Sequence, residues 1–544
     1  MQQMKFILLL VTQLAYSMNI PVYLSLYQRN INILEDKLVD ISNPVSENYG
    51  KWLSHDEIND IVHPTKTNIN KVITWLQVNN VTDINNYGDS IRFTSSKSNV
   101  MNMFTILDST GYTIPDHLEH IIEFVEMSSK KIVRNKKINI KTNNNADDRF
   151  FAREPMVRLY NISDNNLNQS VSGGLVEYQS NDGFTNDDLN FQQIVNEQAI
   201  NNLTNIVGNN VGYDVESELD VQLISQAADG IDLWYWQTPY WLFSFAVDFY
   251  NKDIVPDIIS MSWGWSETSQ CDIIDCGGIT SQQYVQRVNN EYLKIALRGV
   301  TITVSSGDAG APGRTNEGCD SDRPINPVFP GSSPYVVSIG ATYVPVDKTP
   351  HDYTTPICRN QSCITSDDEK SIRLDKVGWT AGGGFNVYQN TTPWWQRKQV
   401  QQYLDSGVKL PNPTHFNQNG RAYPDISAIG HSCPTVVDGQ LSKVDGTSCS
   451  SPVVAGLLSI INNFMWTKHH IKLGYANPLL YYIYENCEDC FRDVTDGYNW
   501  CTEQECCKNT TDYGFNATVG YDPVTGLGTL NIGNILHFLD NYLS

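Results

Sequence analysis

A serine near the C-terminal end of the chain lies in a pattern that could make it a nucleophile. The segment Asp445-Gly-Thr-Ser448 is followed at once by a long apolar run, residues 452–461, which predicts a helix. A tight glycine turn would place the Ser448 hydroxyl at the helix N-terminus, where backbone N–H groups and the helix dipole favour developing negative charge. On position alone, a helix cap is the more common role for such a serine.

A nucleophilic serine needs a base, and the histidines are poorly placed to supply one. Four of the ten histidines precede residue 150, and none lies between His120 and His351. None of the six later ones stands in a His-Gly-Thr sequence. A histidine-dependent triad is therefore hard to assemble, and carboxylates remain as candidates.

Two carboxylates four positions apart are the first candidates. Residues 215–228 read as a helix, and Glu216 and Asp220 lie on one face of it, whereas Glu218 lies on another. Close carboxyls raise each other's proton affinity, so one stays protonated and can orient or shuttle a proton. Such a base works in acid, near the ordinary glutamate pKa of about 4.3. The alternative for this pair is a solvated helix edge.

A third acid follows a predicted strand. Asp308 lies in Ser306-Gly-Asp308-Ala-Gly, directly after the apolar segment 301–305. Acids at the carboxyl edge of a parallel sheet lie where such sheets place their active sites. A protonated Asp308 could donate a hydrogen bond to an oxyanion. The alternative is an ordinary turn aspartate.

These residues need a framework, and the sequence predicts an alternating one. The short apolar runs 258–262 and 301–305 suit buried parallel strands, and residues 283–298 between them have helical spacing. A strand, a helix and a strand of these lengths imply a right-handed crossover. The fold class we expect is α/β, with a doubly wound, mainly parallel sheet.

Composition and charge exclude several classes of protein and of binding partner. The 544 residues are 40% hydrophobic, which excludes wholesale disorder. Lys and Arg number 37 against 60 Asp and Glu, a net charge of −23, so a nucleic-acid partner is not expected. Residues 1–17 read as a cleavable signal peptide, and no other apolar stretch is long enough to predict a membrane span.

Cysteines and glycosylation sequons also predict the secretory pathway. There are 12 cysteines, several in close pairs, of which only Cys487 and Cys490 have the Cys-x-x-Cys spacing of a zinc site. We therefore expect disulfides rather than zinc. Eight Asn-x-Ser/Thr sequons predict a glycoprotein; they begin at Asn80, Asn161, Asn168, Asn202, Asn360, Asn390, Asn509 and Asn516.

The chain divides after a polar linker. Residues 18–148 are almost neutral and end in a basic stretch, 130–137, and an Asn-rich stretch, 143–148, whereas residues 149–544 hold nearly all of the negative charge. A near-neutral module joined by such a linker to an acidic body suggests a removable partner domain. We expect a signal peptide at 1–17, a propeptide at 18–148 and a catalytic domain at 149–544.

Taken together, these motifs resemble the sedolisin family of serine-carboxyl peptidases, in particular its tripeptidyl-peptidase members. The resemblance rests on the order and spacing of Tyr49-Gly-Lys-Trp-Leu-Ser54, Glu216-Ser-Glu-Leu-Asp220, Ser262-Trp-Gly264, Ser306-Gly-Asp308, Phe329-Pro-Gly-Ser-Ser-Pro-Tyr335, Gly382-Gly-Gly-Phe385, Gly420-Arg-Ala-Tyr-Pro-Asp425, Gly446-Thr-Ser448 and Asp522-Pro-Val-Thr-Gly526. It implies a subtilisin-like fold in which carboxylates replace the His-Asp pair, preceded by an α+β propeptide domain.

The resemblance also implies residue roles. Ser448 would be the nucleophile, Glu216 the general base, Asp220 the residue that orients Glu216, and Asp308 the group that holds the oxyanion. The cleft that takes the substrate backbone would be lined by Ser262, Trp263, Gly264, Gly382, Gly383 and Gly384.

The family further implies one structural calcium ion near the C-terminus. The matching positions are Asp493, Val494, Thr518, Gly520 and Asp522, which offer two carboxylates and backbone carbonyls, the oxygen ligands that a hard cation prefers. Thr518 replaces a usual glycine, although either residue supplies a carbonyl. Asp445 replaces a usual serine before Gly-Thr-Ser and adds an acid beside the nucleophile. The cysteine spacing after residue 497 also departs from the family, so the disulfide pairing stays open.

The function implied is an acid-acting peptidase, made as a self-processing zymogen, that releases tripeptides from free N-termini of polypeptides. Its own propeptide would act as inhibitor and folding chaperone, and its compartment would be the lysosome, with secretion as the alternative. Two other functions stay open: an endopeptidase of the same family, and a secreted binding protein on an inactive peptidase scaffold. The intact set of four catalytic positions argues against the second.

Overall fold

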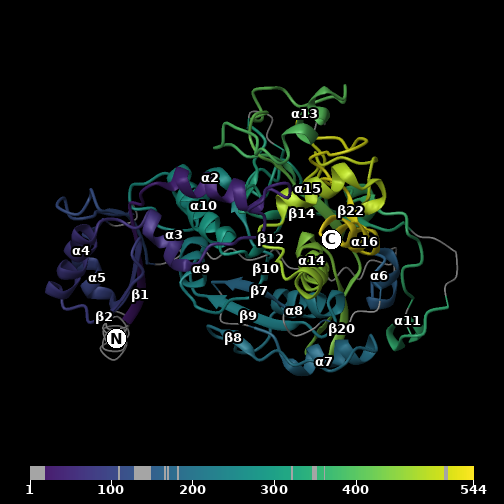
Figure 1. The fold of residues 1–544 in the computed structure, drawn as a ribbon, viewed down its shortest axis with the longest axis horizontal. Coiled ribbons are helices and arrows are strands. Elements are labelled where there is room, and N and C mark those ends of the chain that lie inside the picture. The colour runs from purple at the N-terminus through teal and green to yellow at the C-terminus, as the bar shows by residue number, and fades with distance from the viewer. Residues whose placement is uncertain are drawn as a thin grey trace, which may run out of the picture.

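The computed structural model describes residues 19–107, 111–127, 149–163, 167, 171–179, 183–319, 323–345, 352–360, 362–507 and 513–544. The expected signal peptide, 1–17, and the basic and Asn-rich stretches of the linker, 130–148, lie outside the described residues. Figure 1 shows a small N-terminal module beside a larger body, with helices α2 (Ile31–Ser42) and α3 (His55–Val62) lying between the two.

The N-terminal module is an antiparallel sheet with its own core. The strand order is β2-β3-β1-β6, in which β1 spans Asn19–Leu26 and β3 spans Ser90–Ser96. Burial largely alternates along β3, whereas the consecutive residues 22–26 of β1 are all buried, because the body also covers β1 through contacts such as that of Tyr23 with Asp248. The remaining elements are α4 (Lys66–Val78), β2 (Asp83–Asn86), α5 (Lys97–Met103), β4 (Ile106–Leu107), β5 (Gly111–Tyr112) and β6 (Ile122–Glu126). The expected α+β module is confirmed.

The larger body is built on a ten-stranded sheet with the order β21-β22-β18-β14-β12-β10-β7-β9-β8, and β15 pairs with β14 at one side. All strand pairs from β8 to β22 along this path are parallel. The predicted strands are β10 (Ile258–Met261) and β12 (Thr301–Ser305), and the predicted helix between them is α10 (Ser281–Leu297). The doubly wound, mainly parallel sheet is therefore confirmed.

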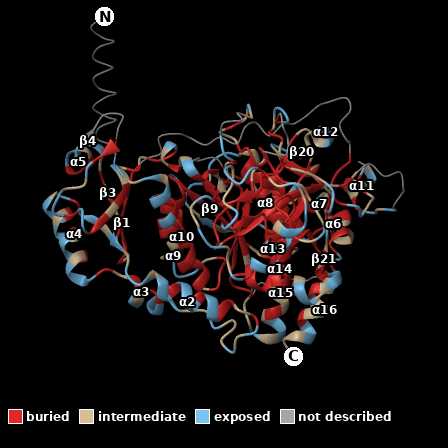
Figure 2. Cartoon of the chain, turned by 90° about the horizontal axis from the view of Figure 1, so that it is seen from above, coloured by how far each residue is buried: buried red, intermediate tan, exposed pale blue. Residues whose placement is uncertain are grey.

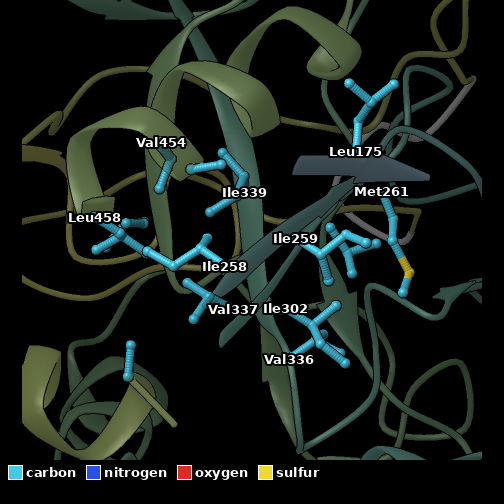
Figure 3. Close-up of a cluster of buried hydrophobic side chains, with 14 of the residues drawn as sticks. Leu175, Ile258, Ile259, Met261, Ile302, Val336, Val337, Ile339, Val454 and Leu458 are labelled. Carbon is cyan, nitrogen blue, oxygen red and sulfur yellow. The ribbon is translucent and has the colours of Figure 1, made fainter. Parts of the chain in front are cut away.

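Successive residues of β10 show that helices cover both faces of the sheet. Ser260 Oγ lies 2.9 Å from Ser451 Oγ on helix α14 (Thr447–His469), whereas the Met261 sulfur accepts a hydrogen bond from Tyr292 of α10 at 3.8 Å. Because side chains alternate along a strand, α14 and α10 pack on opposite faces. Figure 3 shows the apolar contacts on the first face, where Val454 and Leu458 lie near Ile258 and Ile339.

Helix α8 (Val215–Ala227) is not the solvated edge that the sequence left open. Every residue of α8 from Glu216 onwards is buried, as Figure 2 shows. The helix packs against α14, and Gly456 of α14 allows this close approach because a Cβ there would lie 2.5 Å from Ala227 Cβ. Burying a carboxyl group is costly in free energy, so a helix that buries Glu216, Glu218 and Asp220 points to a functional role for these acids rather than to solubility.

The remaining elements complete the body. They are α6 (Arg153–Leu159), β7 (Ser172–Tyr178), α7 (Asn186–Val195), β8 (Asn205–Val207), β9 (Asp232–Thr238), α9 (Leu242–Tyr250), β11 (Trp265–Ser266), η2 (Glu267–Asp272), β13 (Val328–Phe329), β14 (Val337–Tyr343), α11 (Pro356–Asn360), β15 (Lys370–Ser371), α12 (Leu374–Val377), β16 (Gly384–Phe385), α13 (Arg397–Asp405), β17 (Ala422–Tyr423), β18 (Ile426–Ile429), β19 (Cys433–Val437), β20 (Gln440–Val444), α15 (Asn477–Asn486), η3 (Glu488–Cys490), β21 (Phe491–Arg492), β22 (Thr529–Leu530) and α16 (Ile532–Tyr542). Within the described residues, α14 alone has the length and apolar composition of a membrane span, and it is mostly buried inside the body.

Candidate active site

The predicted nucleophile and the predicted oxyanion acid line one pocket at the carboxyl edge of the sheet. Ser262 follows β10 directly, Asp308 follows β12, and Ser448 lies in the first turn of α14. The pocket is lined by Ser262, Gly264, Trp265, Ser266, Ser305, Gly307, Asp308, Ala309, Arg314, Asn326, Val328, Thr447 and Ser448. Three segments that are distant in the sequence thus converge where open parallel sheets bind ligands.

The turn before Ser448 depends on glycine and on Asp308. Gly446 has a φ of 151°, and a Cβ at that position would lie 3.3 Å from Asp308 Oδ2. The Thr447 backbone N–H and hydroxyl both donate to Asp308 Oδ1, at 2.8 and 2.7 Å. The start of α14 is therefore fixed on the acid, and Ser448 is 8% exposed at its N-terminus.

The acids of α8 lie behind this pocket. Asp220 is fully buried, and the Ser262 hydroxyl lies within hydrogen-bond distance of both Asp220 oxygens, at 2.9 and 2.8 Å. Burial and then the charge of Glu216 raise the pKa of Asp220 well above its ordinary value. Glu216 is 3% exposed and therefore shares a low-dielectric environment with Asp220. The structure thus brings together the carboxyl pair that the helical spacing predicted.

A third acid belongs to this cluster and was missed from the sequence. Glu177 on β7 is 1% exposed and accepts a hydrogen bond from the Trp263 indole N–H at 2.8 Å. Burial first, and then the charges of Asp220 and Glu216, raise the pKa of Glu177 well above its ordinary value. In the sequence, the signal for Glu177 was a single acid within an apolar strand. No neighbouring residue in the chain indicated that this acid would lie beside α8.

The residues predicted to line the substrate cleft divide into two groups. Gly264 lines the pocket, while the side chains of Ser262 and Trp263 bond the buried acids. The glycines at 382–384 are absent from the described lining of the Ser448 pocket. Gly382 instead donates from its N–H to the Gly307 carbonyl at 2.6 Å, and a Cβ on it would lie 2.2 Å from the Ser306 carbonyl oxygen. This glycine thus supports the turn that carries Asp308.

No histidine appears among the described residues that line the Ser448 pocket. His431, two positions after β18, has its Nδ1 2.9 Å from Asp445 Oδ1. A larger cavity of about 590 Å³ adjoins the pocket and shares Asn326 with it. Phe385, Phe416 and Ile325 form apolar parts of its wall, and Asp272 and Arg323 provide charges.

The predicted calcium ligands lie together in one loop region. Asp493 Oδ2 accepts from the Gly520 N–H at 2.7 Å, and Asp522 Oδ2 accepts from the Thr518 N–H at 3.0 Å. Burial raises the pKa of Asp522 to about 7, despite three backbone N–H donors, and the charge of Asp493 adds to the rise. The Thr525 hydroxyl donates to the Val494 carbonyl at 3.3 Å, which places that carbonyl in the same region.

The disulfides follow the close cysteine pairs only in part. The bonded pairs are Cys271–Cys276, Cys319–Cys507, Cys358–Cys363, Cys487–Cys490 and Cys501–Cys506. The neighbours Cys506 and Cys507 therefore bond elsewhere, and Cys319–Cys507 ties the 497–507 loop to the segment after Asp308. Cys433 and Cys449 are buried thiols.

Comparisons with known proteins agree with this arrangement. Residues 9–129 match the Pro-kumamolisin activation domain, and residues 210–472 match the Subtilase family. Physarolisin from Physarum polycephalum is 34% identical over 551 residues, 96% of this chain and 93% of that protein. Tripeptidyl-peptidase 1 from Dictyostelium discoideum is 28% identical over 96% of this chain and 89% of that protein, and the Homo sapiens protein of that name is 33% identical over 60% and 52%.

A solved structure supports the fold. The Pseudomonas sedolisin, a serine-carboxyl proteinase complexed with two molecules of pseudo-iodotyrostatin, superposes with a TM-score of 0.54 at 22% identity and covers 73% of this chain and 99% of that one. The fold and the matched domains define a serine peptidase with a subtilisin-like catalytic domain and an N-terminal activation domain. More particularly, the chain belongs to the sedolisin family of serine-carboxyl peptidases.

Proposed function

We propose that this peptidase works in acid, is made as a zymogen that processes itself, and releases tripeptides from free N-termini of polypeptides. The observation that carries the proposal is the junction of three elements at one pocket. Ser448 of α14 and Asp308 after β12 line the pocket, and Ser262 in the same wall bonds Asp220 of α8. The relatives named tripeptidyl-peptidase 1 support the choice of tripeptides.

The proposed chemistry assigns one task to each residue. Glu216 takes the proton from the Ser448 hydroxyl while the oxygen attacks the scissile carbonyl carbon. Asp308 donates a hydrogen bond to the resulting oxyanion. The proton on Glu216 then passes to the leaving amine, and a water molecule, activated by the same carboxylate, hydrolyses the acyl-enzyme. Asp220, held by Ser262, orients Glu216 throughout.

Acidic operation follows from the shared burial of the acids. Glu177, Glu216 and Asp220 interact strongly, so they do not all carry charge at once. A protonated Asp220 can donate to an ionised Glu216, which leaves one base oriented toward Ser448. As the pH rises the cluster loses this shared proton, and the repulsion between like charges then disturbs the base.

The substrate would lie across the pocket wall at Gly264 and beside the larger cavity. That cavity of about 590 Å³ has room for several side chains of a peptide and shares Asn326 with the Ser448 pocket. Ser262, Trp263 and Gly264 would contribute backbone contacts, since the two side chains are engaged by acids. Gly382, Gly383 and Gly384 would line the same cleft, and Gly382 would also support the Asp308 turn.

We also propose one structural calcium ion at the C-terminal loops. Asp493 and Asp522 would supply carboxylates, and Val494, Thr518 and Gly520 would supply backbone carbonyls. The residues fit this cation: Asp522 is fully buried, and no Lys or Arg pairs with either carboxylate within the described residues. Within those residues no cluster of three or more His, Cys, Asp or Glu side chains is found, so carbonyl oxygens would complete the ligand set. The bound ion would neutralise two acids and hold the loops together.

The N-terminal module would serve as inhibitor and folding chaperone until it is cleaved. Residues 149–152 are buried, and the Phe151 N–H donates to the Ser432 carbonyl at 2.9 Å. Cleavage is therefore expected before Arg149, which agrees with the proposed boundary between residues 148 and 149. Five disulfides support passage through the secretory pathway. The acid chemistry suits a lysosome, and secretion is the alternative.

The test pairs two peptides of the same sequence, one with a free N-terminus and one acetylated, and weighs the products by mass spectrometry in acid. Tripeptides from the free peptide alone support the proposal. Internal cleavage of both peptides would instead support an endopeptidase of the same family. Ser448→Ala should abolish turnover and leave the zymogen uncleaved, and retained turnover in this variant would refute the assignment of the nucleophile.

A further inference from the structure

A close contact between a histidine and an aspartate lies directly before the proposed nucleophile. His431 follows β18 by two positions, and Asp445 precedes Gly446, the last residue before α14. His431 Nδ1 lies 2.9 Å from Asp445 Oδ1, and the two side chains are 16% and 21% exposed. The Ser432 backbone N–H donates to the same Asp445 oxygen at 2.8 Å. Asp445 therefore has two partners on the opposite segment.

His431 and Asp445 lie at the open end of a β-hairpin. Strands β19 and β20 leave β18 and return to α14, and Cys433 pairs with Val444 at their open end. The Gly446 N–H donates to the Gly430 carbonyl at 2.9 Å. A Cβ on Gly430 would lie 2.8 Å from the Gly446 carbonyl oxygen, so the two ends are in close contact. Two contacts therefore join the two segments at the open end of the hairpin. One is the backbone hydrogen bond from Gly446 to Gly430, and the other is the side-chain contact between His431 and Asp445.

The same hairpin reaches the helix that carries the acids. The Gln222 side chain on α8 donates to the Val436 carbonyl and accepts from the Val436 N–H, both at 2.8 Å. Asp188 accepts from the Asp438 and Gly439 N–H groups at the tip, also at 2.8 Å. Hydrogen bonds from Gln222 of α8 and from Asp188 of α7 thus hold the hairpin, and the hairpin leads through Asp445 directly into the turn before Ser448.

The charge of Asp445 also acts on the start of α14. It contributes to the raised pKa of the Cys449 thiol, after burial and the contact of that thiol with Cys433. Ser448 precedes Cys449, so a bare carboxylate at 445 opposes negative charge that develops on the serine or its oxyanion. His431 Nδ1, which lies 2.9 Å from Asp445 Oδ1, is the group placed to offset that charge. The other titratable groups that face the pair are Tyr343, whose ring centroid lies 6.5 Å from that of His431, and the thiols of Cys433 and Cys449.

We infer that His431 and Asp445 are positioning residues for the nucleophile. Their contact fixes the turn at residues 445–447, and His431 offsets the charge of Asp445 in that turn. The inference rests on the proposed role of Ser448. It also accounts for the acid that replaces the usual serine before Gly-Thr-Ser, because His431 lies in contact with that acid.

The test measures kcat and KM separately in acid, on processed enzyme, for a double-mutant cycle. His431→Phe should lower kcat about tenfold with little change in KM, because a misplaced nucleophile affects the transition state and not substrate binding. His431→Asn should retain more activity, since its amide keeps a polar N–H group beside Asp445. The exposed His537→Asn is the matched control and should equal the wild type.

The decisive arm is the double variant. If His431 acts through Asp445, the loss caused by His431→Phe should nearly vanish in the Asp445→Ser background. Independent, multiplicative effects, a change confined to KM, or a wild-type kcat in His431→Phe would each overturn the inference. The proposed function fails by a different result, which is turnover by Ser448→Ala, so the two failures are distinguishable. Thermal melts identify a variant that has merely lost its fold.

Discussion

Glu216 and Glu218 stand two positions apart on one helix, and both are buried, yet their surroundings differ. Glu216 shares its environment with Asp220, whereas Glu218 accepts from the Thr185 N–H at 2.8 Å and from the Gln222 side chain at 3.0 Å. Burial raises the pKa of Glu218 to about 8. In acid, therefore, Glu218 is a neutral carboxylic acid in a structural hydrogen-bond network.

This contrast gives a matched set of variants. Glu216→Gln and Asp220→Asn should each lower kcat roughly 10²- to 10⁴-fold, because the base or its orientation is lost. Glu218→Gln should change kcat little, since a glutamine has the shape and neutrality of the protonated acid. Steady-state kinetics in acid, with thermal melts to verify folding, decides the matter. A loss in Glu218→Gln as large as that in Glu216→Gln would refute the assignment of the base by helix face.

At the scale of elements, the segment before α3 shows how the N-terminal module attaches to the body. The Trp52 indole N–H donates to the Lys472 carbonyl at 3.1 Å, and the neighbouring Leu53 N–H donates to the Leu297 carbonyl at 2.8 Å. The ring occupies a slot walled by glycines: a Cβ on Gly299 would lie 2.6 Å from the indole, and one on Gly474 would lie 2.0 Å from it. Trp52 therefore anchors the module.

Removing this anchor should weaken the attachment. In a Ser448→Ala zymogen, which is expected to stay uncleaved, Trp52→Ala should lower the free energy of unfolding or docking by roughly 2–4 kcal/mol, as for an aromatic hot spot, although Trp52 is only half-buried. Trp394→Ala, on the surface of the body, is the control and should cost much less. Denaturant titration measures both variants. Equal losses of unfolding free energy in the two variants would mean that Trp52 in its glycine-walled slot does not anchor the module.

The calcium loop makes a second prediction at this scale. Chelation should lower the melting temperature, because Asp493 and Asp522 then repel each other without a cation. Asp522→Asn keeps oxygen and hydrogen-bonding groups but halves the charge, so its melting temperature should no longer respond to calcium. Asp489→Asn, a nearby exposed acid, is the control and should keep the calcium response. A wild-type melting temperature that chelation leaves unchanged would refute the metal site.

At the scale of the whole molecule, the interface between module and body contains imidazoles that oppose acid. His55 stacks on Tyr250 of the body, with ring centroids 4.7 Å apart. Burial lowers the pKa of His55, and it also lowers the pKa of His63, which lies near Asp89 and Lys294. The docked module thus binds fewer protons at these sites than the undocked one, so docking weakens as the pH falls below the ordinary histidine value of about 6.5.

A buried acid at the same interface has the opposite effect on the pH dependence of docking. Glu126 is fully buried against Trp241 and Ser244 of the body, and burial raises its pKa, so its protonation favours docking as the pH falls. Proton uptake by the two histidines weakens docking as the pH falls through the ordinary histidine pKa of about 6.5, whereas proton uptake by Glu126 opposes that effect. Loss of the module on mild acidification should therefore depend on the imidazoles.

Replacing one of the two histidines tests the predicted direction of this pH dependence. His55→Phe keeps the stack on Tyr250 but takes up no proton, so self-processing should begin at a lower pH than in the wild type. His120→Phe, an exposed position in the same module, is the control and should leave the onset unchanged. The fraction of cleaved chain after incubation across a pH series is the measurement. An onset that moves upward or stays fixed in His55→Phe would contradict the role of His55.

Part of this protein is determined by local sequence. The strands at 258–261 and 301–305 and helix α10 follow from apolar period and length, and the predicted bounds differ from the observed ones by at most two residues. The carboxyl pair of α8 follows from the helical repeat alone, which places residues four apart on one face. Such features depend on neighbours in the chain, so the sequence is sufficient to predict them.

Other features depend on contacts between distant segments, and only the tertiary structure decided them. Glu177 joined the acids because β7 lies beside β10 in the sheet, and Cys507 bonds Cys319 rather than its neighbour Cys506. The burial of α8 is of the same kind, since α14 covers it from more than 200 residues away. Burial and long-range pairing depend on how elements pack, and the local residue pattern that fixes each element holds no information about which distant one will cover it.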